Sequence, residues 1–188
     1  RACFMINLCC TQPILKKLKL DPVALQAQEP VTTTSALGDW YAKYIINERQ
    51  HAIVMVNDRT RMCLVTTAKD IQHLPQRLEA ALADTLAFME VPRHAIEQEV
   101  VHYRDVCYTT TTSAPDGRSV LGSINQYLRS IEHFGITDRS PEAWNHHFLI
   151  WSSSVVSGGS IETIVAKQLL DAYGDAPNEE NPAGGPVL

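Results

Sequence analysis

The stretch HAIVMVNDRTRMCLVTT (residues 51–67) decides the fold. Its two apolar segments, residues 51–56 and 62–67, are rich in β-branched residues, and the polar residues NDRTR between them are typical of a tight turn. The pattern predicts a β-hairpin. Because apolar residues occupy alternate positions on both sides of the first segment, we expect this strand to be central in a sheet and covered on both faces.

The segment before the hairpin, DWYAKYII (residues 39–46), fits two patterns. Alternate positions beginning at Trp40 fit a strand, and a second set that includes Trp40 and Tyr41 fits a helical face equally well. We favour the strand, which would form a three-stranded meander with the hairpin. Further strands are expected at residues 5–10 and 106–112, where apolar and β-branched residues cluster.

Amphipathic helices are expected around these strands. Apolar residues recur at helical spacing in residues 69–90, in 92–104, from Gly117 onward and in 161–173. A short helix is expected after Thr11, which can cap it, and a loop at residues 24–34. These elements predict an α+β fold: a small, mainly antiparallel sheet packed with amphipathic helices on one face, plus a helical C-terminal extension.

Composition divides the 188 residues into three parts. Residues 1–137 are expected to form the α+β domain, 138–174 a helical extension and 175–188 a disordered tail, because the tail is acidic and rich in Pro and Gly. The opening RACFMINLCC lacks the regions of a signal peptide and is interpreted as a buried strand, with Met5 as a candidate for the natural start.

Charge and cysteine content exclude several classes of protein. The net charge is −5 and no long basic run occurs, so the charge pattern does not support nucleic-acid binding. The apolar stretches are too short to span a bilayer. The five cysteines are odd in number and contain no Cys-x-x-Cys pair, which favours a reducing cytoplasm over a disulfide framework.

Familiar catalytic and cofactor motifs are missing from the sequence. It contains no Walker loop, no Gly-x-Gly-x-x-Gly, no Gly-x-Ser-x-Gly elbow and no zinc spacing among its seven histidines. We therefore expect no bound metal and no cofactor. Whether the protein is an enzyme stays open, and catalytic residues are unknown.

The helix that begins with GRSVLGSINQYL (residues 117–128) has a distinctive start. Ser119 is a candidate N-cap. Gly122 costs a helix about 1 kcal/mol relative to alanine, which indicates close approach by another backbone or by a ligand. Arg118, Gly122, Asn125 and Arg129 share one face of this helix.

Two interpretations of this helix start stay open. In the structural one, Arg118 pairs with a carboxylate of the sheet, Gly122 lets the helix pack tightly on the strands, and Asn125 ties down a loop. In the functional one, two arginines flank a helix N-terminus that attracts an anion.

The candidate ligand- or partner-binding residues are polar and aromatic residues near the ends of expected segments: Asp39, Trp40, Asn57, Asp58, Arg59, Thr60, Arg118, Ser119 and Asn125. A carboxylate beside an aromatic ring, such as Asp39 beside Trp40, can be desolvated, which raises its pKa toward values suited to a general acid. In the structural alternative, Asp58 and Thr60 only make the turn and Asp39 caps a segment.

The blocks LCCTQPILKKLKL, LGDWYAKYI, HAIVMVNDRTRMCLVTTAKDI and DGRSVLGSINQY resemble successive blocks of a bacterial family catalogued as domain of unknown function 6933. The resemblance covers residues 5–134. The matching positions are Thr11, Asp39, Trp40, Asn57, Thr60, Arg118, Ser119, Gly122 and Asn125. Lys43 departs from the family, which often has Asn there. The resemblance implies a small α+β bacterial intracellular domain and no particular activity.

We predict a bacterial cytoplasmic domain that works by binding, as a regulatory or accessory partner of another protein. The alternative is an enzyme that acts on a phosphate-containing or nucleic-acid substrate, with Asp39 as acid/base or metal ligand and Arg118 as anion clamp. A third hypothesis is self-association through the helix at residues 161–173. Both ligand-centred hypotheses require Asp39, the turn at 57–60 and Arg118 to meet in one pocket.

Overall fold

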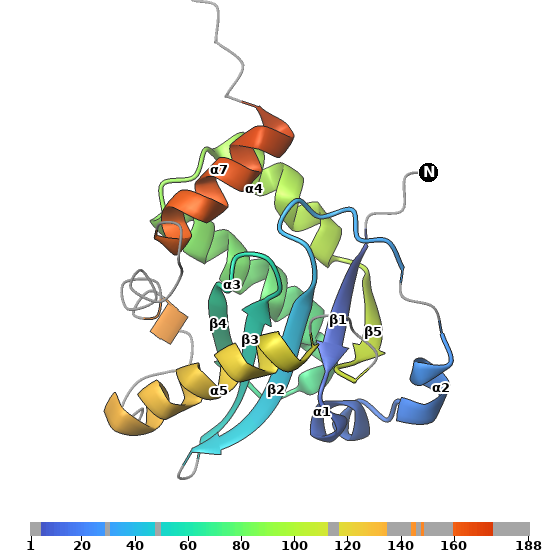
Figure 1. The fold of residues 1–188 in the computed structure, drawn as a ribbon. Coiled ribbons are helices and arrows are strands. Elements are labelled where there is room, and N and C mark those ends of the chain that lie inside the picture. Colours follow the sequence, from blue (N-terminus) through green and yellow to red (C-terminus); the bar gives the residue numbers. More distant parts are fainter. Residues whose placement is uncertain are drawn as a thin grey trace, which may run out of the picture.

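A five-stranded sheet in the order β4-β3-β2-β1-β5 forms the centre of the protein (Figure 1). The computed structural model describes residues 5–28, 31–47, 50–112, 117–134, 144–145, 148 and 160–174. The strands are β1 (Ile6–Cys10), β2 (Trp40–Asn47), β3 (Gln50–Asn57), β4 (Cys63–Thr67) and β5 (Val106–Thr110). The β2-β3-β4 meander is antiparallel, whereas β1 runs parallel to β2 and β5, so the sheet is mixed.

The ambiguous segment at residues 39–46 forms strand β2, so the strand prediction is confirmed. Trp40 and Ala42 point to one side of the sheet and Tyr41 to the other, and all three are buried. Both alternating sets are apolar because β2 lies between β1 and β3 and is covered on both faces.

The helices are α1 (Gln12–Lys17), α2 (Pro22–Gln26), α3 (Leu74–Phe88), α4 (Arg93–Val100), α5 (Gly117–Phe134) and α7 (Ile161–Tyr173), with 3-10 turns η1 (Ile71–His73) and η2 (Val101–Tyr103). The prediction of a loop from residue 24 is wrong at its start, because α2 extends to Gln26. Asp21 caps this helix by accepting a hydrogen bond from the Val23 amide. Thr11 occupies the N-cap position of α1, but its side chain makes no capping hydrogen bond.

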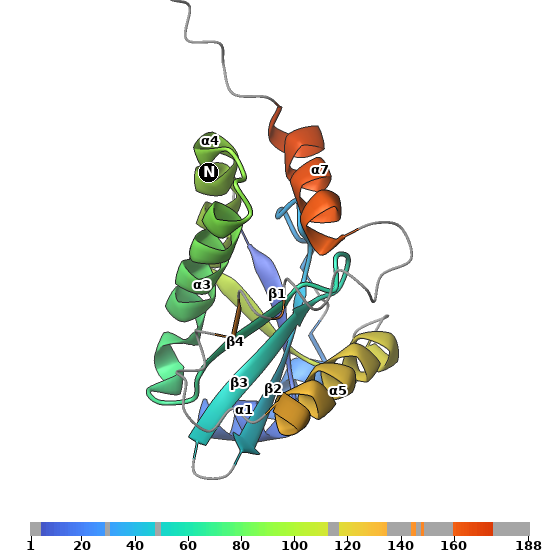
Figure 2. The same cartoon turned by 90° about the vertical axis from the view of Figure 1, so that its left-hand side faces the viewer.

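Helices cover both faces of the sheet, so the expectation of helices on one face is wrong. Figure 2 shows α3 and α4 on one side of the sheet and α5 on the other. On the α3 side, Trp40 and Met55 pack with Leu78 and other residues of α3. On the α5 side, Tyr41, Val54 and Val56 pack with Val120 and Ile124, the latter two from α5. Strands that are apolar on both faces require a cover on both. The α+β class itself is confirmed.

Helix α7 packs into the core of its own chain. Its apolar stripe, Ile161, Val165 and Leu169, is fully buried in the cluster on the α3 side. Self-association through this helix stays a prediction. The tail at 175–188 lies outside the described residues, and the division of the chain at residue 137 stays a prediction. None of the helices in the described part of the chain is long and apolar enough to cross a membrane.

Candidate functional site

The start of β2 and the β3–β4 turn are bonded directly to each other. The Asp39 amide donates to Asp58 Oδ1 at 3.0 Å, and the Asp58 amide donates to the Asp39 carbonyl at 3.0 Å. Asn57 Nδ2 donates to the same carbonyl at 3.2 Å. The structure therefore brings together three of the candidate residues, from two segments that lie on either side of β3.

The residues at 57–60 form a turn built around one buried amide side chain. Asn57 Oδ1 accepts hydrogen bonds from the Arg59 amide at 3.1 Å and from the amide and hydroxyl of Thr60, both at 2.9 Å. Both Asn57 and Thr60 are fully buried. A side-chain oxygen that satisfies the amides that follow it is the usual chemistry of an Asx turn. In this arrangement Asn57 and Thr60 serve the turn.

The polar groups of the Asp39–Trp40 block also have partners within the fold. Asp39 Oδ1 accepts from the Asn7 amide at 2.9 Å, and Asp39 Oδ2 accepts from Asn7 Nδ2 at 3.0 Å. Trp40 Nε1 donates to the hydroxyl of Tyr103 at 2.9 Å. Asp39 thus ties the start of β2 to the neighbouring strand β1.

Arg59 reaches from the turn to the segment before β2. Its Nη1 donates to the Ala36 carbonyl at 3.0 Å, and Gln168 of α7 donates to the same oxygen at 2.8 Å. The carbonyl of Ala36 therefore links the turn and the C-terminal helix.

The carboxyl group of Asp58 has a displaced pKa. Burial raises the pKa of Asp58 above its ordinary value of 3.8, and the neighbouring charge of Asp39 raises it further. Hydrogen bonds from backbone amides and the charge of Arg59 act in the opposite direction without cancelling the shift. The ionised form of Asp58 is therefore less stable in the folded protein than in the unfolded chain.

Replacing Asp58 with Asn is expected to raise stability at pH 7, by less than about 1 kcal/mol because the side chain is partly solvated. Asn keeps the Oδ1 acceptor and removes the charge. The folded pKa is raised, so the penalty is complete above that pKa and disappears as the pH falls below the ordinary value of 3.8. Urea unfolding from pH 7 to pH 3 should show the two proteins converging. A stability difference that is independent of pH would contradict this prediction.

Helix α5 begins at Gly117, so Ser119 lies in its first turn and the expectation that Ser119 is the N-cap is wrong. Val120, Ile124 and Tyr127 are buried against the sheet. The outer face of α5, defined by Arg118, Gly122, Asn125 and Arg129, is exposed.

The outer face of α5 does not have the structural contacts expected for it. A Cβ added at Gly122 would meet nothing within 4 Å, so tight packing on the strands does not explain this glycine. Among the described residues, none of the ion pairs includes Arg118. Asn125 Oδ1 accepts from Lys43 Nζ of β2 at 2.8 Å, and this contact supports the strand-to-helix junction.

Arg61, which the sequence analysis did not single out, joins the turn to α5. Its backbone has a positive φ of 62°. Its amide donates to the Asn57 carbonyl at 3.2 Å, and its carbonyl accepts from the Tyr127 hydroxyl at 2.9 Å. Its Nη2 donates to the Ser119 hydroxyl at 3.1 Å. The turn and the start of α5 therefore meet through Arg61 and Ser119, whereas Arg118 in the same helical turn is exposed.

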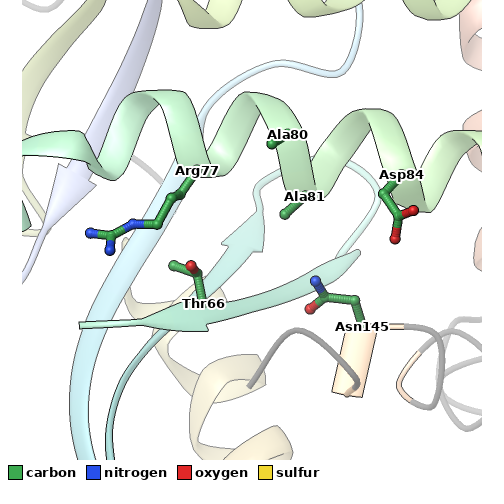
Figure 3. Close-up of a pocket in the computed structure, with 6 residues that line it drawn as sticks. All are labelled: Thr66, Arg77, Ala80, Ala81, Asp84 and Asn145. Carbon is green, nitrogen blue, oxygen red and sulfur yellow. The ribbon is translucent and has the colours of Figure 1, made fainter. Parts of the chain in front are cut away.

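A cavity of about 260 Å³ lies between β4 and α3, lined by Thr66, Arg77, Ala80, Ala81, Asp84 and Asn145 (Figure 3). Arg77 donates from Nη2 to the Asp70 carbonyl at 2.8 Å and from Nη1 to the Lys69 carbonyl. Asn145 Oδ1 accepts from the Val65 amide at 2.6 Å on the edge strand β4. Figure 3 shows Arg77 pointing away from Asp84 and Asn145. These polar groups hold the loop after β4 and protect a sheet edge.

The described part of the chain shows no cluster of metal ligands, and its most buried thiols are unreactive. No group of three or more His, Cys, Asp and Glu side chains there is placed to hold a metal ion. Burial, with the charges of Asp39 and Asp58, raises the pKa of the Cys9 thiol to about 12. Burial also raises the pKa of Cys10 and of Cys63. Thiols with raised pKa values are poor nucleophiles near neutral pH.

Comparison with known proteins adds a family. A family model described as "Domain of unknown function (DUF6933)" matches residues 7–153. The matched region runs past residue 134, where the resemblance was expected to end. No match to the chain was found among the curated proteins. What the domain does therefore has to be argued from its geometry.

Proposed function

This chain belongs to the DUF6933 family of domains of unknown function, and from the placement of its motif residues we propose that it is a binding domain that recognises an anionic group of its partner. The group is a carboxylate or a phosphate. It would lie at the N-terminal end of α5, beside Arg61, Ser119 and Arg118.

The single observation that supports the proposal is the state of Arg61. This residue is half-buried, and its Nη1 atom is buried without a hydrogen-bond partner. None of the ion pairs among the described residues includes Arg61. A buried charged donor without an acceptor costs on the order of 1–3 kcal/mol or more. An anion that accepts a hydrogen bond from Arg61 would remove this cost, so the unpaired donor favours anion binding.

The position of Arg61 against α5 strengthens the argument. Its guanidinium donates to the hydroxyl of Ser119 in the first turn of α5, at the positive end of the helix dipole. That turn has no acidic residue, and Arg118 adds another positive charge to it. An anion at this point would accept hydrogen bonds from the guanidinium groups of Arg61 and Arg118 and would neutralise both positive charges.

The motif residues divide into two sets, and only one set faces outward. Asp39, Trp40, Asn57 and Thr60 make hydrogen bonds inside the fold. Arg118, Ser119 and Asn125 are exposed on α5. Since exposed polar residues are the ones that can reach a partner, α5 is the better candidate for binding. The catalytic alternative loses support because both oxygens of Asp39 already accept hydrogen bonds from Asn7.

We propose a bacterial cytoplasm as the setting. The family resemblance supports the bacterial origin. The free cysteines Cys9, Cys10 and Cys63 support a reducing compartment, because all three are buried as thiols.

Thermal unfolding in sodium sulfate tests the proposal, with sodium chloride at equal ionic strength as reference. We expect saturating sulfate to raise Tm by about 5 °C, as binding to the folded state alone requires. Arg118→Ala, an exposed change that leaves the turn intact, and Arg61→Ala should both reduce the shift.

Arg93→Ala is the matched control, because the Arg93 side chain is 91% exposed on α4. It should keep the full sulfate shift. Anion binding at α5 would be refuted if sulfate did not shift the Tm of the wild type. It would also be refuted if the shift in Arg118→Ala and Arg61→Ala were as large as in the wild type.

A further inference from the structure

We infer that the anionic group belongs to an acidic segment of a protein, which lies along the outer face of α5 with its backbone close to Gly122. The inference rests on the proposed anion recognition and names its partner. It concerns a surface on which the described part of the chain packs no other element.

The outer face of α5 is a straight, exposed track. Its residues at positions 118, 122, 125 and 129 follow the spacing that keeps side chains on one side of a helix. This side is opposite the buried Val120, Ile124 and Tyr127. The eleven residue-to-residue steps of helix from Arg118 to Arg129 span about 16 Å. That length suits a short segment of chain and exceeds the size of a single small ion.

Gly122 lies in this track, and because it has no side chain the helix backbone is accessible there. A Cβ there would meet nothing within 4 Å, so no neighbour within the protein requires a glycine. Glycine weakens a helix interior, yet it is the residue over which another backbone can come closest. A polypeptide crossing α5 at this point would make use of the missing side chain, whereas a free ion at Ser119 would not.

The charges of the track select an acidic segment. Arg118 and Arg129 stand near its two ends, Lys43 lies beside Asn125 at 2.8 Å, and Arg61 flanks its start at Ser119. No acidic residue occurs in α5 before Glu132. The whole chain carries a net charge of −5, so this basic track is a local feature of an acidic protein. The basic track attracts a short acidic segment, whereas the net negative charge of the whole chain repels a long polyanion such as a nucleic acid.

Selection from a display library of random peptides of about 15 residues, a length that covers the track as extended chain or helix, tests the inference. The full chain is the target, and Gly122→Leu is used for counter-selection. We expect the enriched peptides to be rich in Asp and Glu. As synthetic peptides they should bind the wild type and lose about tenfold or more in affinity for Gly122→Leu and for Arg129→Glu.

Ala87→Leu is the matched control, since Ala87 is a small exposed residue on α3. It should bind the selected peptides as the wild type does. No enrichment, enrichment of neutral or basic peptides, or equal affinity for Gly122→Leu would overturn the inference. A single-stranded oligonucleotide that binds more tightly than the peptides and is lost in Gly122→Leu would also overturn it.

The sulfate experiment separates the two proposals. Gly122→Leu leaves Arg61 and Ser119 in place and should keep the sulfate-induced rise in Tm. If that rise is present and the peptides fail, the partner assignment is wrong while anion recognition stands. If the rise is absent in the wild type, the proposed function itself fails.

Discussion

Replacing Glu99 with alanine is expected to lower the free energy of unfolding by about 4 kcal/mol, because five buried or half-buried donors lose their acceptor together. Glu99 is fully buried. Its Oε1 accepts from Ser35 Oγ at 2.5 Å, the Leu37 amide at 3.2 Å and the Tyr103 hydroxyl at 3.1 Å. Its Oε2 accepts from the Ala36 amide at 3.0 Å and the Tyr173 hydroxyl at 2.6 Å.

The effect should be large because Glu99 joins three parts of the chain at one buried carboxylate. The carboxylate on α4 holds the segment at 35–37 before β2, and through Tyr173 it holds the end of α7. The fold tolerates the buried charge of Glu99 because each carboxylate oxygen accepts at least two hydrogen bonds. Loss of the carboxylate would leave those donors unsatisfied and loosen α7.

Urea unfolding of Glu99→Ala and Glu99→Gln measures this effect. Glu99→Gln keeps the size and one acceptor oxygen and should fall between the wild type and Glu99→Ala. Glu97→Ala is the matched control, since Glu97 pairs with Arg93 in an exposed i,i+4 contact on the same helix. It should change stability by less than about 0.5 kcal/mol. A Glu99→Ala protein within about 1 kcal/mol of the wild type would contradict this account.

Gly38→Ala is expected to lower the free energy of unfolding by about 3 kcal/mol. Gly38 has φ of 93°, a conformation that residues with a Cβ rarely adopt. An added Cβ would lie 2.6 Å from Asp58 Oδ1 and 2.7 Å from Arg59 Nε. The side chains of Asp58 and Arg59 would have to move, and the hydrogen bond from the Asp39 amide to Asp58 Oδ1 would be strained.

Gly122→Ala is the matched control for Gly38→Ala. It makes the same chemical change at a helical position with open space, so it should raise the free energy of unfolding by about 0.5–1 kcal/mol. Opposite signs for the two glycines are the result to look for in urea unfolding. A Gly38→Ala protein as stable as the wild type would show that the segment at 38–39 can move without cost.

Local patterns were sufficient to predict most elements of the fold. The hairpin followed from two β-branched segments around NDRTR, and it appears as β3 and β4. The helical spacing of apolar residues predicted α3 and α5. Residues 39–46 were ambiguous because both a strand and a helix explain their apolar positions. Pairing with β1 and β3 decides in favour of the strand.

The candidate site was only partly predictable for a similar reason. The turn chemistry of Asn57 and Thr60 is local and was considered from the sequence. Arg61 and Glu99 were missed, because each acts on residues far away along the chain. Arg61 bonds to Ser119 across 58 positions, and apart from Tyr103 the donors that reach Glu99 lie 62 to 74 positions away.

The sequence by itself determined most of the strands, turns and helices, with residues 39–46 as an exception, since those choices depend on side-chain period and on contacts within a few residues. Tertiary structure alone decided that helices provide the cover on both faces, that Asp39 is held by Asn7, and that Nη1 of Arg61 lacks an acceptor. It also decided that Gly122 faces open space. The physical reason is that neighbours brought together by the strand order β4-β3-β2-β1-β5 leave no mark in the periodicity of either segment.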